Sequence, residues 1–373
     1  MKIKVGITGQ EGFVGQYLYN TLGLFPDEYE RIAYNIEYFQ DQNLLSKFVA
    51  QCDVIVHLAA LNRHNDPRVI YETNILLVNK LIAALKETKS KAHVLFSSSS
   101  QEERDNLYGK SKRDGRELLV GWAKENGGKF TGLVIPNVFG PFGNPYYNSF
   151  IATFSHQLTH NEKPKIEVDG LVKLIYVGDL VKIIINEING GISNYILPIP
   201  HTNEYKVSEI LSLLEKYTEQ YFIAGIIPEL STLFEINLFN TFRGYIDCEK
   251  YFPVKYNQHT DQRGTFVELI RLNIGGQVSF STTAPGITRG NHFHTRKIER
   301  FSVIKGSALI QLRKIGTNEV LNFELDGDDS AYVDMPVWFT HNIKNIGEDE
   351  LYTVFWINEF FDVNDPDTYM ETV

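Results

Sequence analysis

Hydrophobic residues in the first part of the chain occur in short runs separated by longer stretches with a helical period. Runs typical of buried strands lie at residues 3–8, 31–34, 53–58, 91–97 and 130–135. Helical periodicity separates them at residues 42–51, 68–88 and 109–125. Because strands that alternate with helices pair in parallel, this pattern predicts a doubly wound parallel sheet of the Rossmann type, an α/β fold.

The pattern loosens from about residue 144 and changes again after Pro253. The first change gives mixed helices and strands, typical of a substrate-binding lobe, and the second gives short strands separated by Gly, Asn and Asp turns. A length of 373 residues also favours two domains. We therefore predict a Rossmann-type domain at residues 1–247 and an all-β domain at residues 248–373.

Composition and charge exclude several kinds of partner. Hydrophobic residues make up 43% and charged residues 22%, as in ordinary globular proteins. The formal net charge of −10 argues against nucleic acid or an anionic membrane as a partner. Cys52 and Cys248 do not suggest a disulfide framework. With no signal peptide and no apolar run long enough to span a bilayer, we expect a soluble cytoplasmic protein.

The first candidate chemistry is a glycine-rich turn after the first strand. Gly9, Gly12 and Gly15 allow a tight turn, close approach of the backbone to a pyrophosphate, and close packing of helix on sheet. The pattern predicts dinucleotide binding at the start of the following helix. Asn35 stands where an acidic residue would bind the ribose of NAD, which favours NADP, although Glu37 lies close enough to keep NAD open.

A second candidate site combines a serine-rich strand end with a Tyr/Lys pair. Ser99 ends the strand predicted at residues 91–97, and Tyr108 and Lys112 are four residues apart, on one face of a helix. A nearby ammonium group favours phenolate, so we expect Lys112 to lower the pKa of Tyr108 and make it a usable acid or base. Ser99 would hydrogen-bond the reacting carbonyl. An ordinary exposed Tyr/Lys pair is the alternative.

A third candidate site lies near the end of the chain. His292 and His294 are two apart on a strand and point to one face, and a hairpin partner can bring Glu299 beside them. His341 supplies a third imidazole. Three imidazoles and one carboxylate suit zinc and leave room for water or substrate.

The first two sites resemble the extended short-chain dehydrogenase/reductases that act on sugar nucleotides. The resemblance rests on Gly9, Gly12, Gly15, Asn74, Ser99, Tyr108, Lys112 and residues 57–60, 136–140 and 176–179. It implies cofactor contacts from Gly9, Gly12, Phe13, Val14, Gly15, Asn35, Leu58, Ala59, Tyr108 and Lys112. It also implies that Asn74 holds a water that relays protons to Lys112, and that Asn137 meets the sugar nucleotide. Ser100 and Gln101 stand where 4,6-dehydratases carry acids, so dehydration is not expected.

The third site resembles the metal motifs of the cupin superfamily of small β-barrels, with Ser330 and Trp338 in place of two glycines. Residues 261–268, 277–281 and 286–292 resemble the deoxysugar 3- and 3,5-epimerases of that superfamily. This implies that Arg263 engages a nucleotide diphosphate and that Arg289 contacts the substrate. Those epimerases use the residue at His292 as base, but one imidazole nitrogen cannot bind metal and abstract protons at once. The base is therefore open: another residue or a metal-bound hydroxide, with a structural ion as the alternative.

The whole chain resembles the CapF/WbjC family of bifunctional enzymes of bacterial capsule and O-antigen synthesis, including residues 148–154 and 365–369. The resemblance implies that the cupin epimerises C3 of a UDP-2-acetamido-2,6-dideoxy-4-hexulose, and that the reductase then reduces C4 with NADPH. The product would be UDP-N-acetyl-6-deoxytalosamine, toward N-acetyl-L-fucosamine. Asn148 is expected to contact this UDP-sugar, and a homodimer is expected.

Two other functions stay open. The chain could be a 4-reductase or 4-epimerase of another nucleotide sugar, with a cupin that only dimerises and stabilises it. A regulator that senses dinucleotides is disfavoured, because Ser99, Tyr108 and Lys112 are all present.

Overall fold

The computed structural model describes residues 1–147 and 149–373. Its contacts divide the chain into two compact units. The first unit comprises residues 1–153 and 166–210, and the second comprises residues 154–165 and 211–373. No helix among the described residues combines the length and hydrophobicity needed to cross a membrane.

The first unit is built on a six-stranded parallel sheet with the order β2-β1-β3-β4-β5-β8. Its strands are β1 (Ile3–Thr8), β2 (Tyr29–Ile32), β3 (Val54–His57), β4 (His93–Ser99), β5 (Lys129–Ile135) and β8 (Asn194–Pro198). Five of them lie at or within two residues of the predicted runs. The Rossmann-type parallel sheet predicted from the hydrophobic pattern is thus confirmed.

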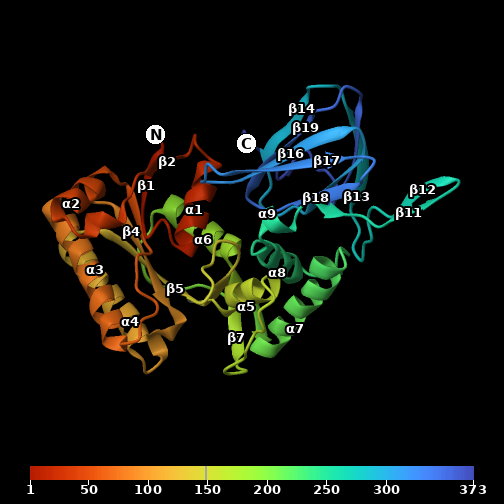
Figure 1. The fold of residues 1–373 in the computed structure, drawn as a ribbon. Coiled ribbons are helices and arrows are strands. Elements are labelled where there is room, and N and C mark those ends of the chain that lie inside the picture. Colours follow the sequence, from red (N-terminus) through yellow and green to blue (C-terminus); the bar gives the residue numbers. More distant parts are fainter. Residues whose placement is uncertain (148) are drawn as a thin grey trace. The chain divides into compact units, whose positions relative to one another are not determined.

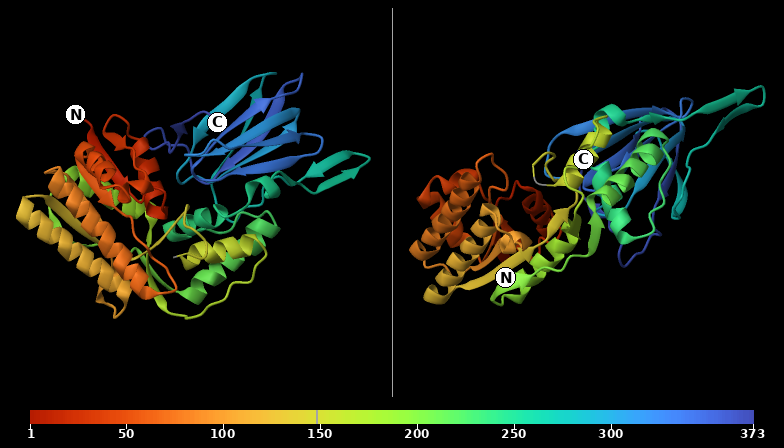
Figure 2. Two further views of the ribbon diagram at one scale, coloured as in Figure 1. Left: turned by 60° about the vertical axis from the view of Figure 1, so that its left-hand side comes forward. Right: turned by 90° about the horizontal axis from the view of Figure 1, so that it is seen from below.

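Helices cover both faces of this sheet (Figure 1). They are α1 (Phe13–Gly23), α2 (Gln42–Gln51), α3 (Pro67–Glu87), α4 (Leu107–Asn126) and α6 (Val177–Gly190), with short helices η1 (Ile36–Phe39) and η2 (Ser100–Glu103). Helices α2, α3 and α4 lie side by side in one layer (Figure 2). Large side chains such as Phe48, Trp122 and Phe130 fill the space between this layer and the sheet.

A smaller sheet extends the first unit beyond β5. It has the order β6-β7-β9 and consists of β6 (Asn137–Phe139), β7 (Leu171–Tyr176) and β9 (Asn203–Lys206). The remaining helices of the chain are α5 (Phe150–Thr159), α7 (Val207–Tyr217), η3 (Thr218–Ile223), α8 (Leu233–Arg243) and α9 (Cys248–Tyr251). This is the mixed region that the sequence predicted after residue 144.

The second unit contains two five-stranded antiparallel sheets. One has β10 (Val254–Lys255), β18 (Ala331–Met335), β15 (Glu299–Lys305), β20 (Leu351–Ile357) and β13 (Gln277–Thr283), in this order. The other has β17 (Val320–Asp326), β16 (Ser307–Lys314), β19 (Phe339–Asn345), β14 (Thr288–Phe293) and β21 (Tyr369–Met370). Buried residues from both sheets, among them Val303, Ile310 and Val333, form one core. The predicted all-β C-terminal region is therefore confirmed.

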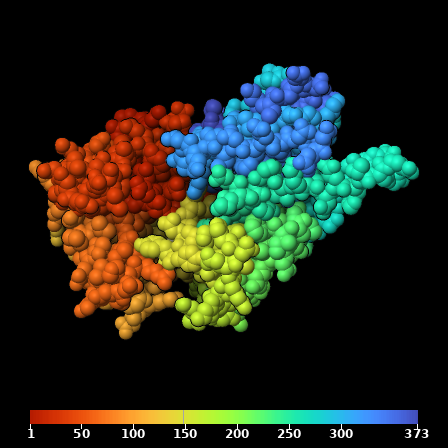
Figure 3. Space-filling model, viewed as in Figure 1, coloured from red at the N-terminus to blue at the C-terminus, as the bar shows by residue number. Residues whose placement is uncertain are grey.

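A hairpin of β11 (Gln258–Asp261) and β12 (Gly264–Val267) projects from the second unit (Figure 3). All of its strand residues but Val267 are exposed.

Buried polar contacts join the helices of the second unit to its sheets. The Arg300 guanidinium donates two hydrogen bonds to Asp334, at 2.8 and 2.9 Å, and both side chains are almost fully buried. Tyr221 donates to the same carboxylate at 2.7 Å, and Arg243 of α8 donates to the Met335 carbonyl at 2.8 Å. Residues 211–247 therefore pack with the β region, while the predicted domain boundary at residue 247 stays a prediction.

Candidate functional site

A cavity of about 760 Å³ opens in the first unit at the carboxyl ends of the parallel strands. This is where open α/β sheets bind their ligands. The lining includes the glycine-rich turn, the residues after β3, the end of β4 and the start of α4. The cavity thus brings the first two predicted sites together.

The glycine-rich turn can exist only with small residues. Gly9 has a φ of +75°, and a Cβ atom there would lie 2.8 Å from the Ala59 nitrogen. A Cβ atom on Gly15 would lie 2.2 Å from the Gly9 oxygen. Gly12 donates its N–H to that oxygen at 3.0 Å and caps α1. The bare backbone at the start of α1 fits the pyrophosphate of a nicotinamide dinucleotide.

The structure places most of the predicted cofactor residues along the cavity. The lining contains Gly9, Gly12, Phe13, Val14, Gly15, Leu58, Ala59, Tyr108 and Lys112. Asn35 is not among them, because its side chain turns back and accepts a hydrogen bond from the Glu37 N–H at 2.9 Å. Its neighbours Tyr34 and Ile36 line the cavity instead.

The Ser99, Tyr108 and Lys112 side chains meet in the same cavity. Strand β4 ends at Ser99, and Asn106 begins α4 by accepting a hydrogen bond from the Gly109 N–H at 2.7 Å. One turn of α4 then places the Lys112 ammonium 5.8 Å from the centre of the Tyr108 ring. The ammonium donates to the Ser97 carbonyl at 2.9 Å, which fixes its position in the cavity wall.

Burial decides the proton affinities at this site. It raises the pKa of the Tyr108 phenol to about 12, and the hydrogen bond with Ser99 offsets only part of this effect. Burial also lowers the pKa of Lys112 to about 8, against the attraction of the Glu102 carboxylate. The predicted lowering of the Tyr108 pKa is therefore wrong in this structure. A phenol that stays protonated at neutral pH is nevertheless the form that can donate a proton to a ketone.

Asn74 and Asn137, two further predicted site residues, make different contacts. The Asn74 side chain accepts from the Leu61 N–H at 2.7 Å and donates to the Ser111 hydroxyl at 3.0 Å, so it ties the loop after β3 to α4. Its predicted part in proton relay stays a prediction. Asn137 lines the cavity and donates to the Lys173 carbonyl at 3.3 Å. Asn148 lies outside the described residues.

A buried ion pair beneath the site was not predicted. Arg116 donates to Glu102 at 2.8 Å, both side chains are about nine-tenths buried, and the Ser98 hydroxyl also donates to Glu102. These contacts join η2 to the end of β4 and to α4, so they position Ser99 and Tyr108. Their only sequence signal is an acid shortly after the serine run.

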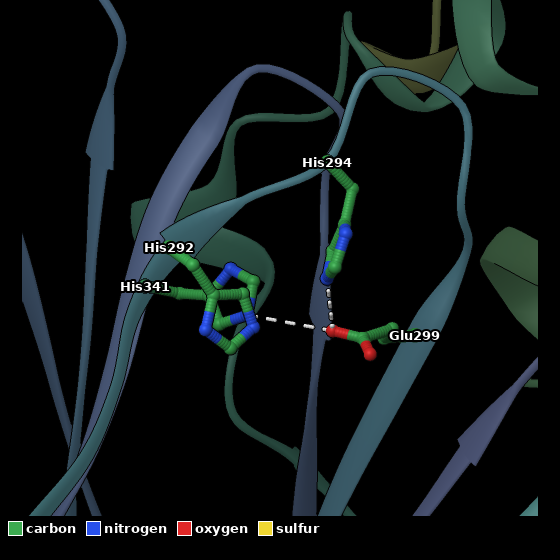
Figure 4. A group of neighbouring side chains, drawn as sticks. All are labelled: His292, His294, Glu299 and His341. Carbon is green, nitrogen blue, oxygen red and sulfur yellow. Dashed lines mark hydrogen bonds and ion pairs between the residues drawn. The ribbon is translucent and has the colours of Figure 1, made fainter. Parts of the chain in front are cut away.

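The four predicted metal ligands come together in the second unit (Figure 4). His292 lies on β14, His294 follows that strand, Glu299 begins β15 and His341 lies on β19. One possible ligand atom of each lies within 4.8 Å of all the others. Strands β14 and β19 pair so that His292 stands opposite His341.

The hydrogen bonds of this cluster fit a bound cation. His294 donates from Nδ1 to the Asp367 carbonyl at 2.5 Å, and His341 donates from Nδ1 to the Phe339 carbonyl at 3.2 Å. In the neutral rings, the Nε2 atoms are then bare, yet they face Glu299 Oε2 at 3.1 and 3.4 Å. Lone pairs directed at a carboxylate repel it unless a proton or a metal ion lies between them. Carbonyl-oriented imidazoles with bare Nε2 atoms are the usual arrangement of zinc ligands.

The charges of the cluster also suit a metal. Burial, together with the two neighbouring imidazoles, lowers the pKa of His292 to about 4. Burial alone would raise the pKa of Glu299, but its contacts with His294 and His341 hold it well below the usual range. For His294, burial lowers the pKa, but the hydrogen bonds and charges of Glu299 and Asp367 together outweigh burial and raise it. An ionised Glu299 and a neutral His292 are the ligand forms that zinc requires.

Asp367, another residue that was not predicted, holds the loop that carries His294. Its buried carboxylate accepts hydrogen bonds from the backbone N–H groups of Thr295, Arg296 and Lys297 at 3.0 to 3.2 Å. Its own carbonyl receives the His294 imidazole. Asp367 therefore fixes both the loop and the ring of one ligand.

Trp338 occupies a position where the cupin motif has a glycine. Its φ is 63°, in the left-handed region that glycine enters without steric cost. The backbone N–H of Trp338 donates to the His294 carbonyl at 2.8 Å. Its buried ring stacks on Phe293, with the ring centres 5.6 Å apart. The indole thus packs against β14, the strand that carries His292.

The two predicted substrate arginines differ in position. A bulge between Gly290 and His292 places Arg289, opposite Ile343, on the same face as His292, opposite His341. The predicted contact of Arg289 with the substrate stays a prediction. Arg263 lies at the tip of the projecting hairpin, with its side chain 85% exposed and paired with Asp261.

Comparisons with known proteins agree with this architecture. Residues 5–190 match the NAD dependent epimerase/dehydratase family, and residues 259–369 match the polysaccharide biosynthesis C-terminal domain. The chain is 32% identical over 372 residues to UDP-2-acetamido-2,6-beta-L-arabino-hexul-4-ose reductase of Pseudomonas aeruginosa, and the match covers 98% of both chains.

Solved structures give the same result. The capsular polysaccharide assembling protein CapF of Staphylococcus aureus is similar with a TM-score of 0.64 and 34% identity, over 99% of this chain and 100% of that one. RMD of Pseudomonas aeruginosa, in complex with NADPH, is similar with a TM-score of 0.53 over 58% of this chain and 83% of that one. At 19% identity, the second likeness shows the fold alone.

Proposed function

Because this chain belongs to the family of the Staphylococcus aureus CapF protein, we propose that it is a bifunctional enzyme with one reaction in each unit. It is an NAD(P)-dependent enzyme of the short-chain dehydrogenase/reductase type. In the proposed reactions, the second unit epimerises C3 of a UDP-2-acetamido-2,6-dideoxy-4-hexulose. The first unit then reduces C4, which gives UDP-N-acetyl-6-deoxytalosamine for capsule or O-antigen synthesis.

One observation carries the reductase proposal: a single cavity holds the glycine-rich turn together with Ser99, Tyr108 and Lys112. The cofactor, when bound, supplies the hydride. Ser99 donates a hydrogen bond to the C4 carbonyl, and Tyr108 donates a proton to the same oxygen. The charged Lys112 then stabilises the phenolate that is left. The sequence favours NADP over NAD, because Asn35 stands where NAD enzymes carry an acid. The choice between the two cofactors depends on the charge at the ribose end of the cavity.

The epimerase proposal rests on the cluster of His292, His294, Glu299 and His341 and on Arg289, which shares a face of β14 with His292. The C3 proton is acidic only while C4 is a ketone, because the enolate spreads its charge onto that oxygen. Arg289 would hold an anionic group of the substrate by guanidinium pairing. Zinc, held by the four side chains, would supply Lewis-acid chemistry at this site. Reduction at C4 removes the ketone and so traps the new configuration at C3.

One observation favours a second function. Arg263, the proposed contact for the diphosphate, pairs with Asp261 on the exposed hairpin of β11 and β12, which projects away from β14 and β19 (Figure 1). A 4-reductase or 4-epimerase of another nucleotide sugar, whose second unit only binds zinc and stabilises the protein, would need no such contact.

Deuterium exchange separates the two functions. We expect the full chain, incubated in D2O with the 4-keto sugar nucleotide and no nicotinamide cofactor, to exchange the C3 hydrogen, as followed by NMR. Tyr108→Phe should keep this exchange, because its hydroxyl lies in the other unit. His294→Ala should lose it. Wild-type protein that reduces the ketone but exchanges C3 no faster than the enzyme-free control would favour the second function.

We also propose a homodimer formed through the second unit. Strand β13 is an edge strand, and it exposes Val278 by 60% and Phe280 by 70%; Phe266 on the hairpin is 67% exposed. Exposed apolar edges tend to pair with another chain. We expect wild-type protein to have the mass of a dimer in size-exclusion chromatography with light scattering, and Phe280→Asp to shift it to the monomer. A wild-type monomer at micromolar concentration would contradict this proposal.

A further inference from the structure

The cavity of the first unit carries a negative charge at the end next to β2. This end is lined by Glu11, Tyr34, Ile36 and Phe39. Among the described residues that line the cavity, the cations are Lys112 and Arg63. Lys112 donates to the Ser97 carbonyl, and Arg63 donates to the Tyr146 carbonyl at 2.8 Å. Both cations are therefore held at other parts of the cavity. Among the described residues, the lining of the end next to β2 therefore presents a carboxylate and no cation, and the Lys80 ammonium, outside the lining, donates to the Phe39 carbonyl.

This end of a Rossmann cavity receives the ribose of the adenosine. An acidic residue after the second strand binds the ribose 2′-hydroxyl of NAD, whereas an arginine nearby accommodates the 2′-phosphate of NADP. Here the second strand is followed by Tyr34 and Asn35, and Asn35 is engaged with Glu37. The acid comes instead from the glycine-rich turn, where Glu11 stands between Gln10 and Gly12.

Glu11 and Tyr34 lie close enough to affect each other. Burial raises the pKa of the Tyr34 phenol to about 12, and the Glu11 carboxylate contributes to that rise. The Tyr34 ring is held by contacts with Phe39 and Phe48, with ring centres 6.3 and 5.4 Å away. The Tyr34 ring is thus held in place beside the exposed Glu11 carboxylate of the glycine-rich turn.

We propose that Glu11 makes this enzyme select NADH over NADPH. Its carboxylate accepts a hydrogen bond from the ribose 2′-hydroxyl of NADH, and it repels the 2′-phosphate of NADPH. A phosphate group carries about −1.5 to −2 charges at neutral pH, and among the described residues no cation lines this end of the cavity to offset the repulsion. The inference rests on the proposed reductase and replaces the expectation of NADP, which was based on Asn35 and Glu37.

Equilibrium binding to the full chain tests this selection without relying on turnover. NADH and NADPH are titrated separately at low salt, with the fluorescence of the reduced nicotinamide as the signal. We expect NADH to bind at least about tenfold more tightly, the effect of charge repulsion at a partly exposed site. Glu11→Gln should remove most of this ratio, and Glu11→Lys should reverse it. Added salt should shrink the ratio in the wild type.

Glu37→Gln is the comparison variant, because it removes the same charge from an acid that follows β2 but does not line the cavity. Equal or tighter binding of NADPH by the wild type overturns the inference, and so does a Glu37→Gln effect as large as that of Glu11→Gln. Tight NADPH binding with reduction of the ketone would leave the reductase standing. Binding of neither nucleotide would instead contradict the reductase itself.

Discussion

Tyr108→Phe should lower the rate of ketone reduction at least about 100-fold, which is the usual contribution of a positioned acid. The structure gives the reason: the Tyr108 phenol is buried, protonated at neutral pH and placed beside Ser99 and Lys112. Nicotinamide cofactor binding should be retained, because the glycine-rich turn is untouched. The measurement is the oxidation of the reduced cofactor with a 4-keto sugar nucleotide at saturating concentrations.

Tyr71→Phe is the matched control. The Tyr71 hydroxyl lies outside the cavity and donates to Asp114 at 2.8 Å, so its loss should change the rate less than about twofold, as for surface positions generally. Near-normal turnover in Tyr108→Phe would contradict the reductase mechanism.

The same site predicts how reduction depends on pH. Lys112 has a pKa of about 8, so its charge is present below that pH and is lost above it. Tyr108, with a pKa of about 12, stays protonated through this range. Reduction should therefore fall as the pH rises through 8, because the phenolate left after proton transfer loses its counter-charge. A wild-type rate that rises through this range would exclude this role for Lys112.

Removal of one imidazole should empty the metal cluster. We expect wild-type protein to contain one zinc ion per chain and His294→Ala to lose it, since the ring is held between Asp367 and Glu299. Because a bound metal also stabilises its fold, the second unit should melt at a lower temperature in this variant. Elemental analysis and calorimetry of protein purified without added metal make the test.

Two further variants define the role of each group in the cluster. His259→Ala changes an exposed histidine of the hairpin and should keep the zinc. Asp367→Ala removes the carboxylate that holds the His294 loop but keeps the carbonyl that orients the ring, so it should weaken zinc binding by about 10-fold, the lower end of the usual cost of losing an outer contact. Full zinc occupancy in His294→Ala would show that the ligand set is wrong.

Local patterns in the sequence were enough to predict the elements that carry the sites. The glycine-rich turn, the strand that ends at Ser99 and the Tyr108/Lys112 pair each depend on residues a few positions apart. The spacing of His292, His294 and Glu299 likewise determines which side chains can share one face. For His341, the register between β14 and β19 completed the set.

What the sequence could not show depends on distance along the chain or on burial. Asp367 meets His294 from 73 positions away, and nothing local links them. The high pKa of Tyr108 comes from burial, which outweighs the hydrogen bond with Ser99. Glu11 escaped notice because the usual position for a ribose-binding residue is after β2, while the carboxylate at that end of the cavity comes from the turn after β1.

The hold of Asp367 on the His294 loop has a consequence for biosynthesis. All four metal ligands precede Asp367 in the chain, so a ribosome releases them before it releases the residue that orients them. A nascent or prematurely terminated chain would own every ligand and still lack a rigid zinc site. Metal loading would therefore follow completion of residues 365–369, and shortened chains would remain metal-poor and exposed to proteolysis.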